Sequence, residues 1–132
     1  MKIRILLALT VLIISAWQLR AQKNDKDLEK ISTALKEADH EKLHNYCNDM
    51  VEISVPGNEG TYSKTQAKFI LRDFFREYPV KDFRIKHEGL SNSGAKFAIG
   101  EYSHQKGKMR TYFLLKNDGK KYSIHIIQFE KQ

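Results

Sequence analysis

The chain has 132 residues, of which 23 are Lys or Arg and 16 are Asp or Glu, and its formal net charge is +7. Hydrophobic residues make up 41%, enough for one buried core, so a wholly disordered chain is excluded. A single cysteine excludes an intrachain disulfide framework and a cysteine-rich zinc site, and no recognisable nucleic-acid-binding signature occurs.

The first 21 residues have the pattern of a secretory signal peptide. Lys2 and Arg4 precede an almost wholly apolar run at residues 5–17, and Ala21 is the small residue expected at a cleavage site. The run is shorter than the roughly 18 to 20 apolar residues of a membrane-spanning helix. We therefore expect cleavage near Ala21, export to the periplasm or the medium, and a single α+β domain at residues 22–132.

The first part of this domain is expected to be largely helical. Apolar residues recur at spacings of three and four between residues 28 and 38, which predicts an amphipathic helix. Asp39 has the character of an N-cap for a short second helix that carries Cys47. The alternating, β-branched run at residues 51–55 predicts a strand, and a short second strand is expected at residues 61–62.

The clearest helix opens at Ser63. Ser63 and Gln66 have the spacing of a capping box, in which each side chain binds the other residue's free backbone amide. Apolar residues follow at helical spacing, and Pro79 ends the helix.

Four strands joined by turns are predicted to follow as an antiparallel meander, at residues 80–88, 97–102, 110–116 and 122–129. The first alternates apolar and polar residues, as a strand with one wet face does. The last two are apolar on both sides, so both of their faces should be covered. Helices can cover only one face, and a partner subunit or a bound molecule is expected on the other.

This order of elements resembles the cone-shaped fold of the nuclear transport factor two-like (NTF2-like, cystatin-like) superfamily. The run that includes Phe83, residues 87–89, residues 97–100 and residues 110–112 is similar to a family of short exported proteins of Gram-negative bacteria known only as a domain of unknown function. The resemblance implies N-terminal helices packed on a strongly curved antiparallel sheet, a conical pocket, and an outer sheet face that often forms a dimer.

Some superfamily members are isomerase-like enzymes with a general-base carboxylate on the stretch after the second helix. The only carboxylate on that stretch here is Glu52, which alternates with Val51 and Ile53 and so points away from the expected pocket. The sequence therefore departs from the isomerase-like members here, because the matching catalytic position is apolar or serine.

The pattern assigns residues to the two faces of the sheet. We expect a small apolar ligand to contact a concave lining made of Leu71, Phe74, Phe75, Phe83, Ile85, His87, Phe97, Ile99, Phe113 and Leu115. We expect a homodimer through the outer face, at Ala98, Tyr102, Tyr112 and Leu114.

Two of these positions could carry acid–base chemistry. His87 follows Phe83 and Ile85 on the presumed inner face, where it could act as a base or hold a ligand carboxylate. It could instead be a structural histidine at the end of its strand. Glu101 could partner His87 from the neighbouring strand, or lie at the solvated mouth of the cone.

A short histidine motif and the lone cysteine have simpler interpretations. His40, Glu41 and His44 resemble the zinc-peptidase pattern, but no third ligand follows at a suitable spacing, and we expect an exposed helix without metal. Cys47 could pair between subunits, but a buried apolar role is more typical of such a residue.

A basic stripe runs along the clearest helix. Its members recur every four residues: Lys64, Lys68, Arg72 and Arg76. They could bind an anionic envelope surface, such as lipid phosphates or an acidic glycan, or form an ordinary solvated face.

Two functions remain open. The first is a non-catalytic exported module that binds a small apolar ligand or another envelope protein, without a cofactor. The second is a small isomerase-, dehydratase- or hydrolase-like enzyme with His87 or Glu101 as general base. The missing carboxylate favours the first.

Overall fold

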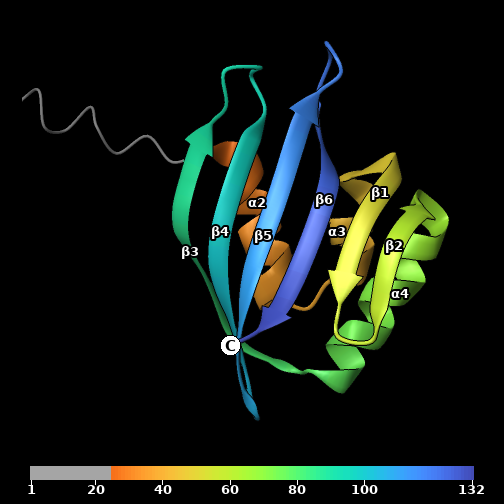
Figure 1. Cartoon of the computed structure of the whole chain (residues 1–132), viewed down its shortest axis with the longest axis vertical. Coiled ribbons are helices and arrows are strands. Elements are labelled where there is room, and N and C mark those ends of the chain that lie inside the picture. Colours follow the sequence, from red (N-terminus) through yellow and green to blue (C-terminus); the bar gives the residue numbers. More distant parts are fainter. Residues whose placement is uncertain (1–24) are drawn as a thin grey trace, which may run out of the picture.

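The structure is a computed structural model that describes residues 25–132, so the predicted signal peptide lies outside the described residues. Two helices, a hairpin, a long helix and four further strands follow one another along the chain (Figure 1). The helices are α2 (Lys26–Lys36), α3 (His40–Asn45) and α4 (Lys64–Glu77). The strands are β1 (Cys47–Val55), β2 (Asn58–Ser63), β3 (Val80–Leu90), β4 (Lys96–His104), β5 (Gly107–Asn117) and β6 (Tyr122–Lys131).

The strands form one curved sheet in the order β2-β1-β6-β5-β4-β3. The predicted meander from β3 to β6 is present, and each of its pairs is antiparallel. The pair of β1 with β6 is parallel, which corrects the expectation of a purely antiparallel sheet. This pair joins strands that are distant in the sequence, so no local turn signal could reveal its direction.

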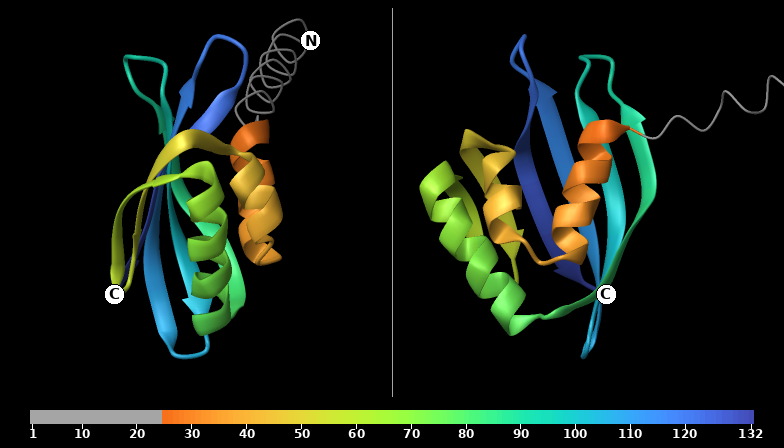
Figure 2. Two further views of the ribbon diagram at one scale, coloured as in Figure 1. Left: turned by 90° about the vertical axis from the view of Figure 1, so that its right-hand side faces the viewer. Right: turned by 180° about the vertical axis from the view of Figure 1, so that it is seen from behind.

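The three described helices all lie on one side of the sheet, and within residues 25–132 no helix covers the other side (Figure 2). We call these the inner face and the outer face. None of the described helices is long and apolar enough to span a membrane.

The predicted helix starts are confirmed by their caps. The side chain of Asp39 accepts a hydrogen bond from the amide of Lys42 at 3.0 Å. Ser63 and Gln66 form both hydrogen bonds of the capping box, at 3.2 and 3.0 Å. Asp25 caps α2 in the same manner, because its carboxylate accepts from two backbone amides of the first turn.

The second helix is shorter than expected. Cys47 is the first residue of β1, not part of α3, and its main-chain pairing is with Ile124 of β6. The register of β1 then shifts before Glu52, which interrupts simple alternation along the strand. The predicted helix extended too far because the first half of β1 is irregular and lacks the period of two by which a strand is recognised in a sequence.

One core fills the space between the helices and the inner face. Leu28 and Leu35 of α2, Leu71 of α4, and Phe113 and Phe129 of the sheet are all at most 3% exposed. These residues belong to one continuous cluster that draws on all three helices.

Candidate functional site

The inner face is filled by the protein's own side chains. Phe74 of α4 stacks on Phe129 with ring centroids 4.2 Å apart, and Tyr102 meets Phe129 at 5.5 Å. Phe83 meets Phe113 edge-on at 6.2 Å. These aromatic contacts occupy the cone at the point where a ligand was expected.

The expected lining divides between core and outer face. The predicted lining residues that lie in the core are Leu71, Phe74, Phe75, Phe83, Phe113 and Leu115, and Ile85 packs partly buried against this core. They contact one another, so their burial explains stability without a bound molecule.

The two faces of β4 are the reverse of the prediction. Ala98 and Tyr102 are buried on the inner face, whereas Phe97 and Ile99 lie on the outer face. Directly opposed residues of antiparallel strands share a face, and Ile99 is opposed to the outer residue Tyr112. The assignment was wrong because β4 is apolar on both sides. Alternation alone could therefore not show which of its residues face the core, which we call the phase of the strand.

Two contacts fix that phase. The hydroxyl of Tyr102 donates a hydrogen bond to the carbonyl of Tyr78 inside the core, and burial raises the pKa of Tyr102 well above its ordinary value. Gly100 lies over the ring of Phe83, where a Cβ would come within 2.7 Å of Cζ. A glycine inside a strand marks such an approach, and it was the one sequence signal for the correct phase.

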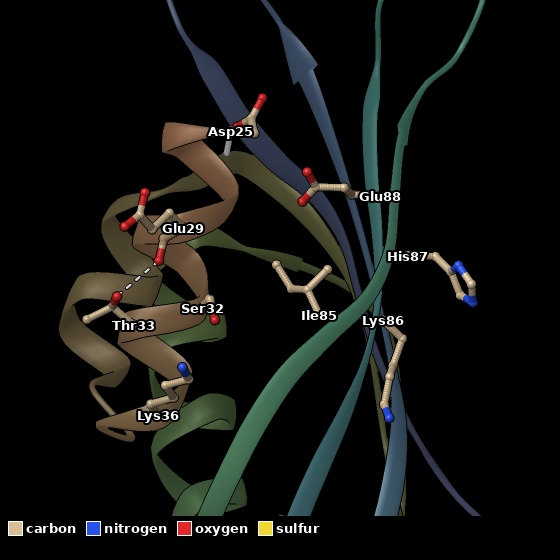
Figure 3. A pocket seen from close by; sticks show the side chains of 9 residues that line it. All are labelled: Asp25, Glu29, Ser32, Thr33, Lys36, Ile85, Lys86, His87 and Glu88. Carbon is tan, nitrogen blue, oxygen red and sulfur yellow. Dashed lines mark hydrogen bonds between the residues drawn. The ribbon is translucent and has the colours of Figure 1, made fainter. Parts of the chain in front are cut away.

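His87 lies on the outer face because β3 contains a bulge. The pairing of β3 with β4 shifts between Ile85 and His87. Figure 3 shows Ile85 and Glu88 pointing toward α2, while Lys86 and His87 point away from it. The placement of His87 in the pocket was therefore wrong, since the extra residue of a bulge reverses the faces that follow.

Glu101 also lies on the outer face. Its carboxylate is 3.3 Å from the ammonium of Lys108, and its side chain is 18% exposed. Glu101 is opposed to Arg84 and Arg110, whereas His87 is opposed to Ile99, two residues before Glu101 in β4. Neither candidate base faces the core, so the two do not form an acid–base pair inside a cone.

The outer face carries an apolar patch at its centre. Five half-buried residues of three neighbouring strands form this outer patch: Phe97 and Ile99 of β4, Tyr112 and Leu114 of β5, and Ile126 of β6. They shield one another sideways, but no described helix covers them. Ile126 was not among the predicted interface residues, although the two-sided apolar pattern of β6 was the signal that could have included it.

A shallow groove lies between α2 and β3. Its volume is about 490 Å³, and Asp25, Glu29 and Glu88 contribute carboxylates to walls that also contain Lys36 and Ile85 (Figure 3). The groove is open and mixed in charge. Its side chains do not converge on a common point as the groups of an active site do.

Carboxylates neutralise two of the four members of the basic stripe of α4. Lys68 forms an ion pair with Glu41 of α3 at 2.8 Å, and Arg72 forms one with Asp73 at 3.1 Å. Lys64 donates to the carbonyl of Asn45 at 3.5 Å. Lys64 and Lys68 therefore join α4 to α3, whereas the ion pair of Arg72 lies within α4 itself.

The histidine motif and the cysteine form no common site. Among residues 25–132, no three His, Cys, Asp or Glu residues are grouped as metal ligands would be. Cys47 is buried, its thiol is 3.5 Å from the carbonyl of Leu43, and burial raises its pKa to about 12. A thiol with so high a pKa is almost wholly protonated at neutral pH and is a poor nucleophile.

The comparisons with known proteins agree with the fold. The model of a domain of unknown function, DUF4783, matches residues 28–130. A crystal structure of a DUF4783 family protein from Bacteroides ovatus ATCC 8483 is 26% identical with a TM-score of 0.74, over 85% of this chain and 98% of that chain. No curated protein matches the chain significantly.

More distant structures share only the architecture. An uncharacterised cystatin-fold protein from Novosphingobium aromaticivorans is 12% identical, with a TM-score of 0.60 over 79% of this chain and 94% of that chain. An NTF2-like protein of unknown function from Shewanella baltica OS155 is 15% identical, with a TM-score of 0.59 over 80% and 87%. The chain therefore belongs to the DUF4783 family, and its fold is the α+β cone of NTF2-like and cystatin-like proteins.

Proposed function

We propose that this protein is an exported, non-catalytic binding module that acts through a protein–protein contact on its outer sheet face. The proposal rests on one observation, the presence of the outer patch. It gathers five apolar side chains from three neighbouring strands, β4, β5 and β6, on a face that no described helix covers.

The composition of the patch suits a protein partner. A contiguous apolar surface at the centre of a sheet is unfavourable in water and marks interaction sites. Phe97 and Tyr112 are aromatic anchors of the kind that dominate binding energy at interfaces, and charged residues such as Arg110 and Glu130 supply a polar rim.

The three alternative functions have less support. A small apolar ligand would have to displace Phe74, Phe83 or Phe113, each at most 3% exposed. An enzyme with His87 or Glu101 as base would have to work on the outer face, without an enclosed pocket to exclude water. An anionic surface bound by α4 would compete with the ion pairs of Lys68 and Arg72.

Site-specific photo-crosslinking in living cells tests this proposal. A photoreactive amino acid replaces Tyr112 in the outer patch or, as the control, Lys30 on the exposed side of α2. We expect a crosslinked product from position 112 and none from position 30. Equal crosslinking from both positions, or none from position 112, would contradict a specific contact at the outer face.

A further inference from the structure

β3 forms one edge of the sheet, and this edge is long. The strand order ends at β3, so β4 is its only neighbour in the sheet (Figure 1). The strand has 11 residues, and its main chain pairs with β4 alone. Among residues 25–132, no main-chain group of another element hydrogen bonds to its other edge. Alternate residues of β3 therefore present unpaired N–H and C=O groups along a free edge.

The first part of this edge is protected from chance pairing, and the last part is less so. Charged side chains predominate at residues 81–86, and the bulge between Ile85 and His87 interrupts the regular edge. Both features keep natural edge strands from pairing with other strands. Beyond the bulge, Gly89 and Leu90 carry no charge, and the side chain of Leu90 is 68% exposed. The edge is therefore most open to a further strand where β3 ends.

α2 runs beside this open part and leaves a groove on the inner side of the edge. Two adjoining hollows, of about 490 and 550 Å³, lie between α2 and β3, and both are bordered by Asp25 and Glu88. Figure 3 shows Ile85 and Glu88 pointing across this groove toward α2. A free sheet edge with room for side chains beside it is the arrangement in which proteins bind an extended peptide as an additional strand.

The bulge brings three side chains of the groove into register. Ile85 and Glu88 are three residues apart in the chain, but their partners in β4 are only two residues apart. The partners of Glu88 and Leu90 are again two residues apart. Ile85, Glu88 and Leu90 therefore follow one another at the spacing of alternate residues in a regular strand. A strand added along this edge would place its own alternate side chains beside them.

The charges of the groove determine the middle side chain of such a strand. Glu29 of α2 and Glu88 border the same hollow, and among residues 25–132 neither carboxylate has an ion pair within 4.0 Å. Lys36 lies at the other end of the groove, and Lys86 points away from α2 (Figure 3). An inward charge on an edge strand disfavours a wholly apolar partner. Glu88 therefore admits a strand that brings a cation to this position.

We propose that the free edge of β3 binds an extended segment of another protein as an additional strand, with the pattern apolar–x–basic–x–apolar, where x is any residue. The main chain of the segment pairs with residues 85–90. Its basic side chain lies between Glu29 and Glu88, and its apolar side chains lie against Ile85 and Leu90. This site goes beyond the proposed function, because it lies at the edge of the sheet and not on the outer patch. Its failure would leave the proposed function intact.

A synthetic peptide tests this site. The probe is the heptapeptide Thr-Val-Thr-Lys-Thr-Val-Thr with both ends capped, and NMR titration of the isotope-labelled protein, produced from the full-length chain, gives the dissociation constant. We expect the signals of α2 and β3 to shift. Glu88→Lys should raise the constant at least about tenfold, because repulsion replaces attraction. Glu59→Lys makes the same change on β2, at the opposite edge, and should leave it within about twofold of the wild type.

Exchange of the charges controls for a damaged fold. A second peptide carries Glu in place of Lys. It should bind Glu88→Lys more tightly than it binds the wild type, since the attraction is then restored with opposite signs. A variant that binds neither peptide would contradict a contact between Glu88 and the basic side chain.

Methylated peptides distinguish an added strand from simple attraction of charges. In an extended chain the N–H groups of alternate residues point to the same edge. One peptide is N-methylated at Val, Lys and Val, and another at the two central Thr residues. One of the two should bind at least about tenfold more weakly than the parent peptide, and the other should bind within about threefold of it.

Two results would overturn the site. The first is a parent peptide that causes no shifts in the wild-type protein at millimolar concentration. The second is equal weakening by the two methylation patterns, because a peptide held only by its side chains does not distinguish them.

Discussion

Lys96 is the residue that fastens the beginning of the folded domain to the sheet. Its ammonium lies 2.7 Å from a carboxylate oxygen of Asp25 and 2.9 Å from one of Asp27, and 4.0 Å from the ring centre of Tyr122. The side chain is only 15% exposed. The N-cap of α2 and the first residue of β4 are thereby joined by charge-assisted hydrogen bonds.

The pKa values of this cluster set the direction of its pH dependence. Burial alone would raise the pKa of Asp25, but hydrogen bonds from Lys96 and from two backbone amides hold it below its usual value of 3.8. Burial alone would lower the pKa of Lys96, but hydrogen bonds to Asp25 and Asp27 raise it. The contribution of Asp25 is therefore present above its unfolded pKa and is lost as pH falls through the folded value.

We expect Lys96→Met to lower the free energy of unfolding by about 1–2 kcal/mol at pH 7, because two carboxylates lose their cation. The difference from the wild type should shrink at pH 3, where Asp25 is largely protonated in the unfolded chain. Urea unfolding at both pH values measures it, with Lys30→Met as the control. A difference that stays the same at pH 3 would show that Asp25 is not the linked group.

Thr111 carries a buried hydroxyl without a hydrogen-bond partner. It is 0% exposed on the inner face, opposed to Gly100 and Phe129, and its Oγ1 has no partner within the described residues. Thr111→Val keeps the shape and removes the hydroxyl, so the free energy of unfolding should be unchanged or higher by up to about 1 kcal/mol. Thr111→Ala, which opens a void, should lower it by about 1 kcal/mol. A clear loss of stability in the valine variant would mean that the hydroxyl binds a buried group.

At the scale of the element, the packing of β3 against β4 depends on Gly100. A Cβ there would lie 2.7 Å from Cζ of Phe83 and 2.8 Å from the carbonyl oxygen of Arg84. Phe83 is 1% exposed in the core and cannot move aside freely. The two strands are therefore held at a distance that only glycine permits.

We expect Gly100→Ala to lower the free energy of unfolding by about 2 kcal/mol, as overpacking of a core does. Gly89→Ala is the matched control, because its Cβ would lie 2.8 Å from the ring of Phe97 on the outer face. That ring is half-buried and can turn away, so the cost should be below about 1 kcal/mol. Thermal or urea unfolding gives the comparison, and equal costs for the two variants would contradict this difference in freedom.

The elements differ in how far the sequence predicts them. The caps at Asp39 and Ser63 are local patterns, and both are present in the structure. The phase of β4 and the bulge in β3 depend on what lies across the sheet, and neither leaves an alternation that can be read from one strand. His87 was assigned to the wrong face for this reason, and the candidate acid–base site in the cone that depended on it was therefore wrong as well.

At the scale of the whole molecule, the order of elements indicated the cone fold, and residue runs such as 87–89 and 97–100 indicated the family. The parallel pair of β1 with β6 joins distant segments and was missed. The apolar character of β5 and β6 on both sides indicated that both faces need cover. The filling of the cone depended on how the aromatic rings of α4 and the sheet interlock, and sequence spacing does not determine this.

Export is a further expectation for the whole chain. If residues 1–21 are a signal peptide, expression of the full-length chain in a Gram-negative host should yield a periplasmic or secreted protein. Its intact mass should be that of residues 22–132, with Gln22 as the first residue. Replacing apolar residues at 5–17 with charged ones should retain the uncleaved chain in the cytoplasm. Recovery of the unaltered chain from the cytoplasm with Met1 still present would contradict export.

Native mass spectrometry of the exported protein distinguishes a function of the outer face from a function of the cone. We expect the mass of the cleaved chain, alone or in a protein complex, with no added small molecule, because the protein's own side chains fill the cone. A reproducible added mass of a small molecule on either form would contradict this view and return the search to a ligand site.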